Sequence, residues 1–192
     1  MSVAASQALS LLLERYSLGG KDLTEPGPSQ SQLQLITLAA LRAPDHAELS
    51  PFRLIIIEKN ARNRLADLFE AYARRHGKTE ESCAIERSRA LQVPVTIAIV
   101  ARIDLSHPLV AAHEQWACVG GAITNILNAM HMLGYAGKML SGGKVRDQAL
   151  IEAFCQPGET LVGWIVAGTP TRALRARSGK QTDKILSWFK AD

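Results

Sequence analysis

RAPDH at residues 42–46, followed by FRLIII at residues 52–57, marks a change from helix to strand within a few residues. Pro44 disfavours helix at the residue before it, so the helical pattern that precedes it ends there. The run at 52–57 is rich in β-branched residues and predicts a strand. The turn between them carries a guanidinium group and an imidazole. We therefore expect Arg42 and His46 to lie together beside the edge of a sheet.

The rest of the chain alternates between helical spacing and short apolar runs. Helices are expected at residues 4–15, 60–76, 80–91, 113–133 and 145–154, and strands at 52–58, 94–101, 136–140 and 160–167. A further helix is expected to be capped by Ser29 or Ser31 and to end at Arg42. Residues 17–29 are rich in Gly, Pro and Ser and predict a loop, and Gly168-Thr169-Pro170 is expected to end the last strand. Helices come first and strands are then interleaved with helices, which indicates an α+β fold with a mixed or antiparallel sheet. We expect a single domain over residues 1–192, with a basic tail at 171–192 that ends in apolar residues.

Composition excludes several classes of protein. The net charge of +4 is modest and scattered, and aromatic residues make up only 5% of the 192 residues, so a nucleic-acid partner is not expected. No apolar stretch reaches the ~18 residues that a membrane span needs. The start of the chain has no signal-peptide pattern. Three cysteines without close pairs indicate a reducing compartment. We expect a cytoplasmic protein with no membrane partner.

Common catalytic motifs are incomplete in this chain. His113-Glu114 lacks a second histidine at position 117, so a zinc site of that type is not expected. Gly137–Lys144 resembles a phosphate loop only in part, and no glycine fingerprint for dinucleotides follows a strand. Cys118 falls inside an apolar helix, where an inert thiol is the expected state. We expect neither a metal site nor a catalytic side chain.

Two arginine clusters remain, and each ends a predicted helix. Arg15-Tyr16-Ser17 follows the first helix, and Arg42 with His46 follows the second. Guanidinium groups bind phosphate through a rigid fork, and a hydroxyl adds one more donor. The set suits a phosphorylated planar cofactor. The alternative is that each arginine only complements the carbonyl end of its helix, which is worth ~0.3–1 kcal/mol without any ligand.

Several motifs, in order along the chain, resemble the FMN-dependent nitroreductase family and in particular its small, minimal-domain branch. They are LLERYS at 12–17, LRAPDH at 41–46, SPFR at 50–53, Glu114 at the start of the long helix, GYAG at 134–137 and GTP at 168–170. Arg-x-Ser alone is a weak signal, whereas the ordered set is specific. The resemblance covers residues 8 to 170.

The resemblance implies a three-layer fold and a homodimer that binds FMN at the subunit interface, with the tail reaching the partner subunit. It implies that Arg15, Tyr16 and Ser17 hold the phosphate and ribityl chain. Arg42 and His46 would face the flavin or its phosphate, across the interface. Four residues would line the isoalloxazine, with backbone amides directed at N5: Met139, Leu140, Ser141 and Gly142.

The implied activity is ping-pong hydride transfer from NADH or NADPH through flavin N5 to nitroaromatics, quinones or similar flat acceptors. The chain departs from the branch where the flavin-side loop carries Trp-Arg-Ser, because Met139 and Leu140 replace the aromatic residue and the arginine. A cation would then come from Lys138, Lys144 or the basic tail. Three alternatives stay open: a flavin-binding or flavin-sequestering protein without turnover, a specialised relative such as a dehalogenase, and an interaction domain that recruits a partner through its tail.

Overall fold

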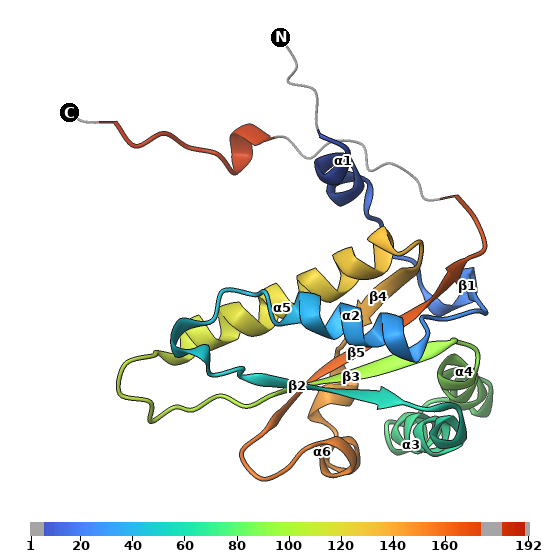
Figure 1. Ribbon diagram of the computed structural model, residues 1–192. Helices are drawn as coiled ribbons and strands as arrows, with labels where there is room; N and C mark the ends of the chain where they lie inside the picture. The colour runs from blue at the N-terminus through green and yellow to red at the C-terminus, as the bar shows by residue number, and fades with distance from the viewer. Residues whose placement is uncertain (1–5, 174–181, 191–192) are drawn as a thin grey trace.

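The computed structural model describes residues 6–173 and 182–190, which form a sheet between two layers of helices (Figure 1). The helices are α1 (Gln7–Glu14), α2 (Gln30–Ala40), α3 (Arg62–Arg75), α4 (Glu80–Leu91), α5 (Ala112–Met132) and α6 (Gln148–Phe154). The strands are β1 (Leu23–Thr24), β2 (Phe52–Ile57), β3 (Val95–Ala101), β4 (Ala136–Leu140) and β5 (Thr160–Pro170). This is the α+β fold that the order of elements indicated, with the three layers that the resemblance implied.

The long strand β5 organises the sheet. Within the residues that the structure describes, it pairs with three strands: β1, β3 and β4. The remaining strand, β2, pairs with β3, and all four pairings are antiparallel. Ser17 adds a single parallel bridge to Gly137 of β4, where Leu18 N donates to Gly137 O at 3.2 Å. The segment that follows α1 therefore lies beside β4 and brings the N-terminal part of the chain to the sheet.

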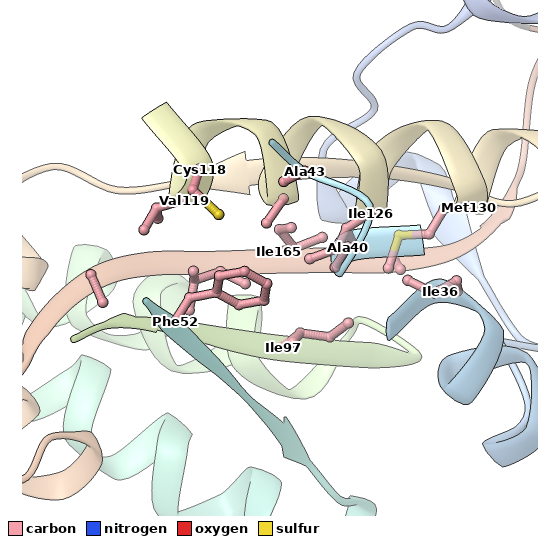
Figure 2. Packing of buried hydrophobic residues seen from close by; sticks show 14 of the residues in the cluster. Ile36, Ala40, Ala43, Phe52, Ile97, Cys118, Val119, Ile126, Met130 and Ile165 are labelled. Atoms are coloured by element: carbon pink, nitrogen blue, oxygen red, sulfur yellow. The ribbon is translucent and has the colours of Figure 1, made fainter. Parts of the chain in front are cut away.

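Helices α2 and α5 cover one face of the sheet. Figure 2 shows how Ile36 and Ala40 of α2 and Ile126 and Met130 of α5 pack with Ile165 of β5 in one buried cluster. Each of these five side chains is almost completely removed from water. Burial of a large aliphatic side chain contributes ~1.5–3 kcal/mol, so this cluster fixes α5 across the sheet.

Helices α3, α4 and α6 cover the opposite face. Trp164 of β5 is buried there between two aromatic rings, with its centroid 5.1 Å from that of Phe69 and 5.9 Å from that of Phe154. Both pairs meet edge to face, which is a favourable arrangement of aromatic quadrupoles. The two faces of the sheet thus have separate cores, and residues that alternate along a strand belong to different ones.

Most of the expected helices and strands are present in the structure, which corrects the expectations at three places. The bounds of α4 and β4 are those expected. The segment at 17–29 was expected to be a loop throughout, but it contains β1. The expectation that Gly168-Thr169-Pro170 ends the last strand is wrong, since β1 supplies a pairing partner at Thr169 and Pro170 and β5 continues through them.

The predicted helix at 145–154 starts later than expected. Gly143–Arg146 form a 3-10 turn, and α6 begins after Asp147, whose carboxylate accepts a hydrogen bond from Leu150 N at 3.2 Å. An aspartate in this position satisfies an N–H group that the helix itself leaves unpaired. In the described part of the chain, no helix combines the length and the apolar character needed to cross a bilayer.

Candidate functional site: a pocket between β4 and α4

Strand β4 presents alternate side chains to the two faces of the sheet. Lys138 and Leu140 pair with Val166 and Trp164 of β5 and face the α4 side, whereas Met139 packs in the cluster under α2 and α5. Ser141 follows the strand and lies on the α4 side as well. Of the two β4 residues expected to follow the flavin ring, the structure therefore places one on each face.

A glycine pair ends β4. Gly142 has a φ of 102°, a left-handed conformation that side chains other than glycine rarely adopt. A Cβ at Gly143 would lie 2.2 Å from the hydroxyl of Tyr72, so this position accepts no side chain unless the side chain of Tyr72 moves. The turn can therefore pass close to α3 and carry Lys144 back toward the sheet.

A pocket of about 570 Å³ opens between β4, β5 and α4. Its walls include Leu140 and Ser141 from the end of β4 and Gly19–Lys21 from the segment beside that strand. Apolar groups supply much of the remaining surface: Leu65, Phe69, Ile85, Ala90, Val93, Trp164 and Val166. The size suits a small planar molecule, since ligand sites commonly enclose 300–1,000 Å³.

Two buried polar groups in this wall have no hydrogen-bond partner among the described residues. They are the hydroxyl of Thr96 and the indole N–H of Trp164, and both side chains are only 2% exposed. An unpaired buried donor or acceptor costs ~1–3 kcal/mol, so such groups usually meet a partner. A ligand that carries its own donors and acceptors would supply that partner.

The charge of the pocket is predominantly positive. Lys21, Arg89, Lys138 and Lys144 line it together with one acidic residue, Glu86. This set suits a ligand with negative charge, because opposite charges attract strongly where water is partly excluded.

Glu86 is buried at the centre of this group of charges. Its carboxylate lies 2.5 Å from Lys144 Nζ, 2.7 Å from Arg89 Nη1 and 3.2 Å from Lys78 Nζ. Burial works to raise the pKa of Glu86, but the hydrogen bonds and charges of these cations outweigh it, and the pKa lies below the ordinary value. Glu86 is therefore ionised at neutral pH.

The Arg15-Tyr16-Ser17 segment lies at the outer edge of β4. Arg15 Nη1 donates to Ser17 Oγ at 3.5 Å, and both side chains are half-buried. Tyr16 packs against the small cluster that contains Leu18 and Leu140. The parallel bridge between Ser17 and Gly137 thus places the residues predicted to bind the phosphate directly beside β4, the strand that lines the pocket.

Arg42 and His46 lie elsewhere in the chain. Both are exposed, and His46 contacts Glu114 in the first turn of α5. Gly137, by contrast, lies against Met130 near the other end of that helix. Glu114 and Met130 are 16 residues apart, which corresponds to about 24 Å along a helix. Within one protomer the structure does not bring Arg42 and His46 to the Arg15 segment.

The residues around the pocket fit FMN in their chemistry. The pocket provides apolar walls for a tricyclic ring, two unpaired polar groups for its heteroatoms and cations for its negative charge. Arg15 and Ser17 offer phosphate donors nearby. This fit depends on residues from β3, β4, β5 and α4 and on the segment after α1.

Sequence reasoning did not find four of these residues: Glu86, Arg89, Thr96 and Trp164. The helix at 80–91 is more polar than the others, and the spacing of Glu86 and Arg89 is the ordinary spacing of an ion pair on a helix surface. Thr96 and Trp164 sit within apolar strands, where a core role is the usual interpretation. Lys138 and Lys144 were among the candidate cations, and both line the pocket. Of the basic tail, residues 174–181 and 191–192 lie outside the described residues.

Comparisons with known proteins point to one family. The model described as "Nitroreductase family" matches residues 14–169. The chain is 34% identical over 163 residues to a "Putative NAD(P)H nitroreductase" of Haemophilus influenzae, with 84% of this chain and 88% of that protein covered. It is 32% identical over 164 residues to YdjA of Escherichia coli, which carries the same description, with 85% and 88% covered.

Solved structures share the fold. A nitroreductase-like family protein from Bacillus cereus superimposes with a TM-score of 0.81 at 19% identity, over all of both chains. A "putative nitroreductase in complex with fmn" from Desulfovibrio desulfuricans gives a TM-score of 0.73 at 20% identity, over 98% of this chain and 100% of that one. At these identities the likeness concerns the architecture of the chain.

Proposed function

This chain belongs to the nitroreductase family, and on that premise we propose that it is an NAD(P)H-dependent oxidoreductase that works through bound FMN. The observation that carries the proposal is the pocket beside β4, which combines two unpaired buried polar groups with four cations and apolar walls. The relative of known structure that was solved with FMN has the same fold, which supports the choice of cofactor.

Arg15 and Ser17 would bind the phosphate, with Tyr16 packed beside them, and Leu140, Ser141 and Gly142 would follow the ring system. Met139 faces the other side of the sheet, so only its backbone is available for that role. Bound FMN would supply the redox chemistry, since its N5 accepts a hydride and its electrons pass on to a second substrate. The protein would bind and orient both substrates in turn and hold the ring in a partly dry pocket.

A homodimer would complete the site. Apolar side chains are exposed on α1, α2 and α5, among them Leu13, Leu38 and Trp116. Apolar surface of this kind, contributed by three neighbouring helices, is typical of a protein interface. A second copy packed on these helices would bring its Arg42 and His46 toward the Arg15 segment of the first, which the distance along α5 prevents within one chain. The tail would add to the same interface.

The net reaction that we propose for a nitroaromatic acceptor is a two-electron reduction. NAD(P)H, a proton and the nitro compound give NAD(P)+, the nitroso compound and water. A quinone would take the same two electrons and two protons to give the hydroquinone. No described side chain needs to act as a nucleophile, so the rate would depend on how well the two rings are aligned. The expected location is the cytoplasm.

A visible spectrum of the purified protein, reconstituted with FMN, tests the proposal. We expect flavin absorption bands and their bleaching when NADPH or NADH is added under argon, followed by recovery on addition of a quinone. A protein that takes up no FMN would overturn the proposal. A protein that binds FMN but oxidises neither nucleotide with any acceptor would instead be a flavin-binding protein without turnover.

A further inference from the structure

Lys144 occupies an unusual position for a lysine. Its side chain is 19% exposed, and its Nζ lies 2.5 Å from Glu86 Oε2. The same ammonium group lies 4.8 Å from the ring centroid of Phe69 and 5.6 Å from that of Tyr72. An ammonium over an aromatic face is attracted by the ring quadrupole, by ~0.5–2 kcal/mol. These contacts from α3 and α4 fix the charge at the wall of the pocket.

The other lysines of the pocket are less constrained. Lys21 and Lys138 are exposed to solvent, where a charge acts through a medium of high dielectric constant. Arg89 also contacts Glu86, but its side chain is 62% exposed. Among the lysine and arginine side chains that line the pocket, Lys144 is the most deeply buried, so solvent screens its charge the least.

Glu86 does not cancel the charge of this cluster. One carboxylate contacts three cations, Lys78, Arg89 and Lys144, so the four groups together carry a net charge of +2. The carboxylate side chain is only 6% exposed and joins α4 to the turn after β4. Its geometry is therefore that of a group that holds three cations in place.

We propose that Lys144, held in place by Glu86, is the cation that stabilises the negative charge of reduced FMN in this pocket. Glu86 is then a positioning residue that acts through Lys144. Leu140, at the end of β4, carries no charge. Lys144 follows Leu140 by four residues and lines the same pocket. The inference rests on the proposed role of FMN and adds the residue that tunes its reduction.

The test uses the FMN-reconstituted protein and compares affinities for oxidised and reduced FMN. Lys144→Met is expected to weaken binding of reduced FMN about tenfold relative to oxidised FMN, which lowers the midpoint potential of a two-electron couple by about 30 mV. Lys144→Arg should retain most of the preference. Lys59→Met is the control, because it removes an exposed lysine that does not line the pocket and should change the ratio less than twofold.

A double-mutant cycle tests the role of Glu86. In a Glu86→Gln background the effect of Lys144→Met should fall below threefold, since the ammonium is no longer fixed. Glu86→Asp, which keeps the charge but withdraws the carboxylate, replaces Glu86→Gln if that variant does not fold. If the Glu86–Lys144 pair only stabilised the fold, its variants would lower the unfolding temperature of the FMN-free protein. They would leave the ratio of the affinities for oxidised and reduced FMN unchanged.

Two results would overturn the inference: an unchanged ratio in Lys144→Met, or a full tenfold effect that persists in the Glu86 variants. Neither result affects the proposed function, because in both cases the protein still binds FMN. Absence of FMN binding by the wild-type protein would reject the proposed function itself.

Discussion

His46 Nδ1 lies 3.0 Å from Glu114 Oε2, so the turn after α2 is joined to the first turn of α5. Asp45 supports the same turn from within, because its carboxylate accepts hydrogen bonds from two backbone N–H groups further along. The turn is strained, since three residues other than glycine have φ between 46° and 63°. They are Ala47, Glu48 and Ser50. These contacts hold the imidazole of His46 at the surface, where 56% of the side chain is exposed.

The first prediction concerns Glu114. The hydrogen bond from His46 lowers the pKa of Glu114, which is therefore ionised at neutral pH. Glu114→Gln should weaken FMN binding threefold to tenfold in a fluorescence titration, because the ring of His46 loses a charged partner. Glutamine can still accept the hydrogen bond from Ala111 N that caps α5. His113→Asn, at the exposed neighbouring position, is the control, and an equal loss in both variants would contradict the argument.

The second prediction concerns the composition of the site from two protomers. A chain with Arg15→Ala and Ser17→Ala is co-expressed with a chain that carries Arg42→Ala and His46→Ala, and mixed dimers are purified through two tags. If each site takes one cluster from each protomer, a mixed dimer has one intact site and should bind one FMN. Each parent dimer should bind at least tenfold more weakly. Mixed dimers that bind FMN no better than either parent would show that no site combines one cluster from each protomer.

The third prediction concerns the turn that ends β4. A methyl group at Gly143 would collide with the hydroxyl of Tyr72, so Gly143→Ala should lower the free energy of unfolding by ~1–3 kcal/mol. The added change Tyr72→Phe removes the colliding oxygen and should recover most of the loss in chemical denaturation. Tyr72→Phe alone is the control. If the double variant is no more stable than Gly143→Ala, the collision is not the cause.

The fourth prediction concerns stability in acid. Hydrogen bonds from Arg53 lower the pKa of Glu159 from 4.5 to about 2. Arg53 Nε and Nη2 donate to its two oxygens at 2.8 and 2.6 Å. A carboxylate whose pKa is lowered on folding adds stability above its unfolded pKa, and this is lost as pH falls from about 4.5 toward 2. Its size at neutral pH is at most ~3 kcal/mol.

Denaturation of wild type and Glu159→Gln at several pH values measures this contribution. The variant should be ~1–3 kcal/mol less stable at pH 7, and the gap should narrow between pH 4.5 and pH 3. Glu58→Gln, on an exposed carboxylate, should show little change at any pH. A gap that stays constant with pH would mean that the charge of Glu159 is not responsible.

The fifth prediction concerns the tail. Trp188 and Phe189 are 79% and 103% exposed, and Ile185 is 86% exposed. Burial of such side chains against a second copy would stabilise a dimer, so deleting residues 180–192 should raise the dimer dissociation constant at least tenfold in sedimentation experiments. Lys190→Ala, which leaves the apolar residues in place, is the control. If the deletion affects neither dimer formation nor FMN binding, the tail would instead serve to recruit another partner.

The sequence alone determined most of the helices and strands of this protein and their order. Helical and strand spacing placed α4 and β4 at their observed bounds, because apolar periodicity reports which face of an element is buried. It did not place β1 or the continuation of β5 through Pro170, since a two-residue strand has no period of its own. The pairing with β5 decides both, and pairing joins residues that are almost 150 positions apart.

The local clusters around Arg15 and Arg42 were also readable from the sequence, because each follows a helix end that the residues themselves specify. Only the tertiary structure separated them along α5, and only it gathered Glu86, Lys144 and Trp164 around one pocket. Three elements supply those residues, and nothing in the spacing of each indicates the others. The charges, burial and unpaired polar groups of the pocket arise only when packing brings distant segments into contact. The pattern of a single segment does not predict that contact.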